Sequence, residues 1–189
     1  ANVTFQRNKL LSLSGMYNGE MISAPEYKSL ASLDGAGFHG GYNHIVYQMV
    51  GQPLGVFYLP HSTGLVSDGN GGYTYGIADL NGGGVNLEDG EDRYVAGQAV
   101  PKTILGSNIS FRYKHFDLSV QINGAFGHKI YNGTSLTYMN MNIFPDYNVM
   151  KSAPKQNIKD QTATDYWLEK GNYVNFDYVT FGWNVPIEK

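Results

Sequence analysis

The amino-acid sequence predicts an all-β fold in which a few long antiparallel strands alternate with long connections. Three observations favour this class among the 189 residues. Apolar and polar residues alternate with a period of two, helical periodicity is almost absent, and the connections differ sharply in length. One connection has two residues, whereas others have many tens of residues. The chain therefore carries an uneven set of loops on a small number of strands.

The clearest strands are expected at residues 103–113 and 116–126. In the second of them the apolar residues are Phe116, Leu118, Val120, Ile122 and Phe126, and the intervening polar residues are Asp117, Ser119, Gln121 and Asn123. This alternation gives a strand one apolar face and one polar face. Lys114-His115 separates the two segments, so we expect a hairpin with a two-residue turn.

Two further strands are expected near residues 1–13 and 173–185, the second ending before Pro186. The segments between the strands, residues 14–102 and 127–172, are rich in Gly, Asn, Asp, Pro and Tyr. In the first segment, residues 24–33 are expected to form a short helix. Residues 45–59 and 73–78 are candidates for a smaller hairpin. Loops of this length are uncommon in compact domains and indicate a function or a large scaffold.

Composition excludes several classes of function. The net charge of -3 without a basic cluster argues against a nucleic-acid partner, and the absence of cysteine excludes disulfide scaffolds and thiolate metal sites. No stretch of about 18 apolar residues predicts a membrane-spanning helix. No catalytic motif stands out, so we expect no enzyme activity. Gly35–Gly40 has the spacing of a dinucleotide fingerprint, but without a preceding strand it is expected to be a loop.

The unequal loops favour a transmembrane β-barrel segment over a soluble sandwich. Outer-membrane barrels have short periplasmic turns and long extracellular loops. Eleven residues at about 3.3 Å each, tilted by roughly 40°, cover about 28 Å along the membrane normal, close to the apolar band of about 25 Å. A soluble antiparallel sandwich also gives alternating faces, and periodicity alone favours it because soluble β domains are commoner.

Several motifs resemble one family. They are VTFQRNK (residues 3–9), VGQPLGVFY (50–58), DRYVAGQAVPK (92–102), SFRYKHFDLS (110–119), GAFGHKIYNGT (124–134), YWLEKGNY (166–173) and TFGWNVP (180–186). In this order they resemble the SusC-like TonB-dependent outer-membrane transporters. The resemblance spans the whole chain and implies a late part of a barrel of roughly 22 strands, without its plug domain.

The same resemblance implies a location and partners. The chain would lie in the bacterial outer membrane, with residues 14–102 and 127–172 as extracellular loops. TonB and a SusD-like surface lipoprotein would be its protein partners, and an oligosaccharide or peptide-like nutrient its substrate. The alternative is a soluble carbohydrate-binding β module, with or without bound calcium.

One loop carries a candidate calcium site. Asp79 and Asn81 occupy the first and third positions of a calcium-loop pattern, and Asp89 lies next to its twelfth position. Gly83 and Gly90 stand where two further ligands are expected, so a glycine-rich turn without metal is the alternative. No other cofactor is expected.

Aromatic residues leave two alternatives open at two places. Residues around the last strand, namely Tyr166, Trp167, Tyr173, Tyr178 and Trp183, are candidates for the aromatic girdles of a membrane barrel or for core residues. Loop aromatics, namely Tyr42, Phe57, Tyr58, Tyr73 and Tyr75, either stack on sugar rings or pack the loop on itself.

Overall fold

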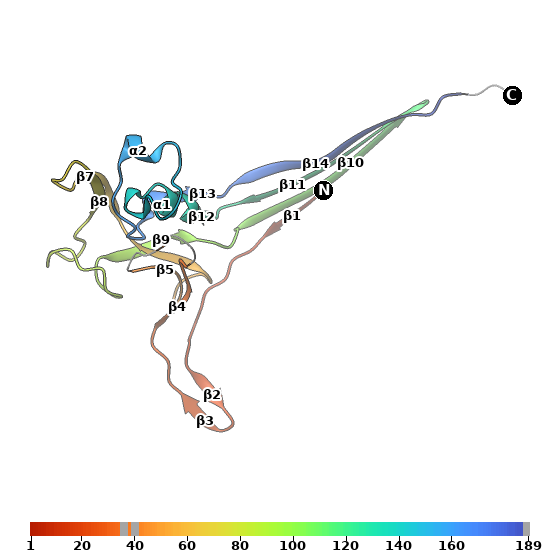
Figure 1. The fold of residues 1–189 in the computed structure, drawn as a ribbon. Coiled ribbons are helices and arrows are strands. Elements are labelled where there is room, and N and C mark those ends of the chain that lie inside the picture. The colour runs from red at the N-terminus through yellow and green to blue at the C-terminus, as the bar shows by residue number, and fades with distance from the viewer. Residues whose placement is uncertain (35–37, 39–41, 187–189) are drawn as a thin grey trace. The chain divides into compact units, whose positions relative to one another are not determined.

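The computed structural model describes residues 1–34, 38 and 42–186. The chain divides into two compact units (Figure 1). The first, here called the sheet unit, comprises Ala1–Arg7, Val100–His128 and Lys170–Lys189. The second, here called the loop unit, comprises Asn8–Ala99 and Lys129–Glu169. The segment with the glycine spacing of a dinucleotide fingerprint, Gly35–Gly40, lies outside the described residues except for Phe38.

The sheet unit is one antiparallel sheet of four strands in the order β1-β10-β11-β14. Its strands are β1 (Asn2–Phe5), β10 (Thr103–Tyr113), β11 (Phe116–Phe126) and β14 (Tyr173–Trp183). β10 and β11 begin and end where the sequence pattern places them. Tyr113 pairs with Phe116 across the expected two-residue turn, in which Lys114 has a φ of 50°. Among the described residues β1 and β14 remain the sheet edges, so these four strands do not close into a barrel.

The first strand is shorter than predicted. It ends at Phe5 instead of continuing to residue 13, although the Gln6 N–H still donates to the Lys102 carbonyl at 2.9 Å. Beyond this point the backbone pairs elsewhere, because the Leu10 N–H donates to the Gln52 carbonyl of the loop unit at 2.9 Å. The alternation of residues 3–11 therefore did not reveal where the pairing partner changes.

The last strand contains an irregularity in its middle. Gln121 of β11 pairs with Tyr178, but the next residue, Ile122, pairs with Phe176. Asp177 is therefore an extra residue in β14, as in a β-bulge. The strand ends at Trp183, two residues earlier than predicted, and the Asn184 N–H donates to the His115 carbonyl at 2.7 Å.

The loop unit has a second antiparallel sheet of four strands in the order β4-β5-β6-β9. These strands are β4 (Tyr27–Ser32), β5 (His44–Met49), β6 (Val56–Pro60) and β9 (Arg93–Gln98). Three two-stranded sheets accompany it: β2 (Gly15–Tyr17) with β3 (Glu20–Ile22), β7 (Ser62–Ser67) with β8 (Tyr73–Ile77), and β12 (Lys129–Tyr131) with β13 (Leu168–Lys170). The short helices are α1 (Gly133–Tyr138), η1 (Met141–Ile143), α2 (Ala153–Gln156) and η2 (Asp165–Trp167).

Two local predictions in this unit are wrong. The helix expected at residues 24–33 is strand β4, because pairing with β5 outweighs a weak helical pattern. The expected hairpin of residues 45–59 with 73–78 does not form. Gly51 and Gly55, with φ values of 84° and 67°, help reverse the chain, so β5 pairs with β6, while β8 pairs with β7.

The buried core of the described residues lies in the loop unit. One cluster gathers Ile45, Phe57, Leu59, Tyr75, Ala96, Leu136, Ile158 and Ala163, and a second gathers Tyr47, Val56 and Tyr58. Neither cluster contains a residue of the sheet unit. None of the described helices is long and apolar enough to span a membrane.

Candidate functional site

The sheet unit presents an apolar face whose side chains line up across three strands. The rungs, read from β10 through β11 to β14, are Tyr113, Phe116 and Trp183; Phe111, Leu118 and Phe181; and Ile109, Val120 and Val179. The exposed fraction is 61% for Phe111, 67% for Phe181 and 61% for Val179. An apolar surface this continuous needs a partner that is not water.

The apolar face is most aromatic near the β10–β11 turn. The Phe116 ring stacks on that of Phe181 at 5.6 Å between centroids and on that of Trp183 at 6.2 Å. Trp183 is 59% exposed, so these stacked rings do not form a buried core. Large aromatic side chains at the end of an apolar strand face are typical of a membrane interface.

The opposite face of the same strands is polar and internally hydrogen-bonded. The Asn108 side-chain amide donates to Gln121 Oε1 at 3.0 Å and to the Tyr178 hydroxyl at 2.9 Å. The Asn123 amide donates to the Asp177 carboxylate at 2.5 Å. The bulge thus directs Asp177 to the polar face beside Tyr178. These strands therefore carry an exposed apolar face on one side and a hydrogen-bonded polar face on the other.

The five candidate girdle residues differ in the face and the unit to which they belong. Trp183, at the end of β14, lies on the apolar face beside Phe116 and is 59% exposed, as expected of a girdle residue. Tyr173, at the start of β14, is 49% exposed but pairs with Ala125, which places it on the polar face with Asn175. Tyr178 lies in mid-strand on the polar face, where it pairs with Gln121. Trp167 belongs to the loop unit, packs against its core and donates to the Tyr75 hydroxyl at 2.7 Å.

In the loop unit, Arg93 is the centre of a buried polar cluster. Its Nη1 donates to Asp89 at 2.6 Å and to the Tyr47 hydroxyl at 3.0 Å, and its Nη2 donates to the His44 carbonyl at 2.8 Å. Tyr47 is fully buried and donates to Asp89 at 2.6 Å. Burial, together with this hydrogen bond, raises the pKa of the Tyr47 hydroxyl. The cluster joins β5 to β9 and the segment before β9.

A second polar cluster surrounds Asp165 of η2. Its carboxylate accepts from the Tyr94 hydroxyl at 2.6 Å and from the Ser62 N–H at 2.6 Å, and it lies 2.8 Å from His61 Nδ1. Burial opposes ionisation of Asp165, but the hydrogen bonds from Tyr94, His61 and Ser62 outweigh it and lower its pKa. The cluster joins η2 to β7 and β9. The residues of this cluster come from three distant segments of the sequence, so no sequence pattern predicted that they would lie together.

The candidate calcium residues lie in a loop held by carboxylate-to-backbone hydrogen bonds. Asp79 accepts from the N–H groups of Gly82 at 2.6 Å and Gly84 at 2.9 Å, and Asn81 donates to Glu91 at 2.7 Å. Asp89 is paired with Arg93. Over the described part of the chain no three His, Asp or Glu side chains are grouped as metal ligands usually are. Calcium binding here stays a prediction.

Asp92 organises this loop, a role that its position in the sequence did not indicate. Asp92 is fully buried and accepts from the N–H groups of Asn86 at 2.7 Å, Leu80 at 2.6 Å and Asn81 at 3.2 Å. These bonds, led by that from Asn86, lower the pKa of Asp92 although burial opposes ionisation. A single carboxylate thus closes the loop from residue 80 to residue 92.

Three of the five candidate loop aromatics pack inside the loop unit, and two are exposed. Phe57, Tyr58 and Tyr75 are buried and pack the loop unit on itself. Tyr42 and Tyr73 are 44% and 43% exposed. In the same unit Asn132 begins α1, because its side chain accepts from the Ser135 N–H at 2.9 Å as a helix N-cap.

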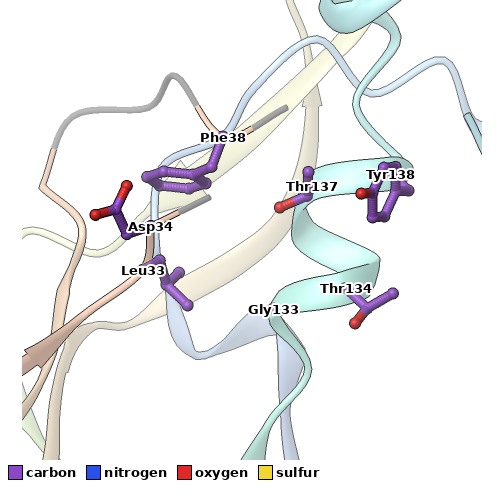
Figure 2. A pocket seen from close by; sticks show the side chains of 7 residues that line it. All are labelled: Leu33, Asp34, Phe38, Gly133, Thr134, Thr137 and Tyr138. Carbon is purple, nitrogen blue, oxygen red and sulfur yellow. The ribbon is translucent and has the colours of Figure 1, made fainter. Parts of the chain in front are cut away.

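The loop unit also contains a pocket beside α1 (Figure 2). Its volume is about 290 Å³. Leu33, Asp34 and Phe38 form one wall, and Gly133, Thr134, Thr137 and Tyr138 form the other. The lining residues therefore carry two aromatic rings, three hydroxyls and one carboxylate around one small space. The sequence did not indicate this pocket, because its two walls are about a hundred residues apart.

Comparison with known proteins adds a distant relationship. The chain is 27% identical over 203 aligned positions to TonB-dependent receptor P3 of Formosa agariphila, and the match covers 96% of this chain. The chain spans 19% of the length of that relative. No model of a known protein family matches the chain. The chain is thus a distant homologue of part of a TonB-dependent receptor, and its antiparallel sheets are compatible with a piece of such a receptor's barrel.

Proposed function

We propose that this chain forms part of the wall and the extracellular loops of a TonB-dependent importer in the bacterial outer membrane. The observation that carries the proposal is the sheet of β1, β10, β11 and β14, with one exposed apolar face and one hydrogen-bonded polar face. In a membrane barrel the first face contacts lipid and the second lines the lumen. The distant homology to a TonB-dependent receptor supports the same function.

The open sheet edges support a larger barrel. Lipid cannot hydrogen-bond the free backbone groups of an edge strand, so strands that span a membrane must close into a barrel. β1 and β14 would therefore pair with strands of the remaining protein, in a barrel of roughly 22 strands as the resemblance implies. The loop unit, with its own buried core, would be the extracellular part.

The finer assignment is a SusC-like importer. It would bind an oligosaccharide or a peptide-like nutrient together with a SusD-like surface lipoprotein, and TonB would supply the energy for release through the barrel. The residues of this chain would supply walls and binding surface, without covalent chemistry. The motifs quoted for the SusC-like resemblance support this assignment across both units.

Uptake by whole cells tests the proposal. Cells carrying the complete protein should accumulate a fluorescently labelled oligosaccharide, and deletion of either tonB or the gene for this protein should abolish accumulation. Uptake that persists without TonB would contradict the mechanism. The second candidate is a soluble carbohydrate-binding module. In that case the apolar face of β11 must be buried in the core of the chain itself when the chain is in aqueous solution. A monodisperse detergent-free monomer of the 189-residue chain, with Phe116 and Val120 protected from solvent, would favour that candidate.

A further inference from the structure

The pocket beside α1 has walls that are fixed by the same core. Leu33 and Phe38 on one side pack against the larger buried cluster, and Leu136 of α1 is a fully buried member of it. The Leu33 backbone is held further, because its N–H donates to the Asn43 carbonyl at 2.8 Å and its carbonyl accepts from the Asn43 amide at 2.9 Å. The pocket is therefore pre-formed.

The helix side of the pocket is equally constrained. The Asn132 side chain caps α1 and also donates to Glu169 at 2.7 Å, while its N–H donates to the Trp167 carbonyl at 2.9 Å. At Gly133 an added Cβ would lie 3.1 Å from Leu33 Cδ2, so the absence of a side chain lets the two walls approach. Thr137 is only 9% exposed and projects toward Phe38 (Figure 2).

The lining chemistry suits a ring with an apolar face and a hydroxylated edge. Aromatic rings have a negative face that attracts polarised C–H groups, and Phe38 and Tyr138 supply two such rings. Thr134 and Thr137 supply hydroxyls, and Asp34 supplies a carboxylate that disfavours anions. A volume of about 290 Å³ lies at the small end of ligand sites, which favours one sugar ring over a longer segment.

We propose that this pocket is a subsite for one neutral pyranose ring of a saccharide. Phe38 contacts the C–H face of the ring, while Thr137 and Asp34 hydrogen-bond its hydroxyls. The inference rests on the proposed function, since it takes the substrate class to be an oligosaccharide and assigns one of its sugars to a defined place in the loop unit.

Saturation-transfer NMR on the complete protein in detergent micelles tests the subsite. The probes are methyl β-D-glucopyranoside and methyl β-D-galactopyranoside, with tri-alanine as the peptide comparison. We expect saturation of the ring C–H protons of at least one glycoside. Thr137→Val, which keeps the side-chain shape, should weaken its binding about fivefold, the value of one neutral hydrogen bond. Asp34→Asn should weaken it about tenfold, because a bond to a charged acceptor is lost.

The controls separate the pocket from general effects. Phe38→Ala should remove most of the signal, whereas Tyr17→Ala, which removes an exposed aromatic of β2 outside the pocket, should leave it unchanged. Equal binding by Thr137→Val, Asp34→Asn and the unmodified protein would overturn the subsite. A signal from tri-alanine alone would overturn the sugar assignment. If the pocket substitutions leave glycoside binding unchanged while TonB-dependent uptake persists, only the subsite proposal is wrong. If uptake does not depend on TonB but Thr137-sensitive glycoside binding remains, only the importer mechanism is wrong.

Discussion

Replacing Val120 by arginine, with Gln121→Arg as the matched control, tests which face of β11 meets lipid. The two residues are neighbours, yet Val120 pairs with Ile109 and Val179 on the apolar face, whereas Gln121 pairs with Asn108 and Tyr178 on the polar face. Both variants add the same charge at nearly the same height in the strand. Any difference between them therefore reports the environment of each face.

The expected magnitude follows from the depth of Val120. It lies four residues beyond Phe116, the first residue of β11. This is about 13 Å along the strand and about 10 Å along the membrane normal for a tilt near 40°. In an apolar band of about 25 Å the position is close to the midplane, where an arginine costs about 2 to 4 kcal/mol. That cost lowers the folding equilibrium constant roughly 30- to 900-fold. Gln121→Arg loses one exposed hydrogen bond from Asn108, about 0.5 to 1 kcal/mol.

The assay is urea-dependent folding of the complete protein into phospholipid vesicles, followed by the mobility of the folded barrel in electrophoresis without boiling. Val120→Arg should lower the urea midpoint clearly, and Gln121→Arg should lower it little. Equal losses at the two positions, or a larger loss for Gln121→Arg, would refute the assignment of the faces.

Three further predictions concern the loop unit. Because Asp165 has a folded pKa below its ordinary value, its carboxylate stabilises the unit above about pH 4 and this contribution is lost as the pH falls toward the folded pKa. When the pH falls from about 6 to about 3, the hydrogen-exchange rate of residues 61–67 should therefore rise more than the exchange rate of an unprotected amide changes. Asp165→Asn should remove this extra pH dependence. If the variant keeps the same pH dependence, the assigned role of Asp165 is refuted. Arg93→Met should lower the opening free energy of β5 and β9 by about 2 kcal/mol in hydrogen exchange, since the buried Tyr47 hydroxyl and Asp89 lose a partner. The control variant Lys151→Met, at an exposed position, should change the opening free energy of β5 and β9 by less than about 0.5 kcal/mol. Similar effects of the two variants would count against a special role for Arg93. The proposed calcium site predicts that Ca²⁺ but not Mg²⁺ protects residues 79–92 from proteolysis and that Asp79→Asn abolishes this protection; no protection by Ca²⁺ would favour the glycine-rich turn.

The long strands were predictable because their information is local. Residues 108–123 alternate between apolar and polar side chains on either side of a two-residue turn, and the register follows from these two features. The bulge at Asp177 was not predictable, because Phe176, Asp177 and Tyr178 read as ordinary strand residues. It depends on the register between two strands about fifty residues apart.

The loop unit shows where sequence patterns stop being informative. Residues 27–32 form a strand because β5 is available to pair with them. The bounds of β5 depend in turn on the chain reversal at Gly51 and Gly55, which pairs β5 with β6. Apart from the Asp89–Arg93 pair, the clusters around Arg93 and Asp165 join residues 42 to 104 positions apart. Their partners are common residue types without a fixed spacing, so only the folded chain brings them together.

The most direct test of the central claim measures lipid contact on neighbouring residues of β14. In a cysteine-free background of the complete protein, Val179→Cys and Thr180→Cys are labelled with an environment-sensitive fluorophore in vesicles containing brominated lipid. Val179 is 61% exposed opposite Val120, whereas Thr180 pairs with Ser119 on the polar face. Strong quenching at residue 179 and weak quenching at residue 180 is the predicted result. Equal quenching at both residues, or stronger quenching at residue 180, would contradict a membrane wall with this apolar face toward lipid.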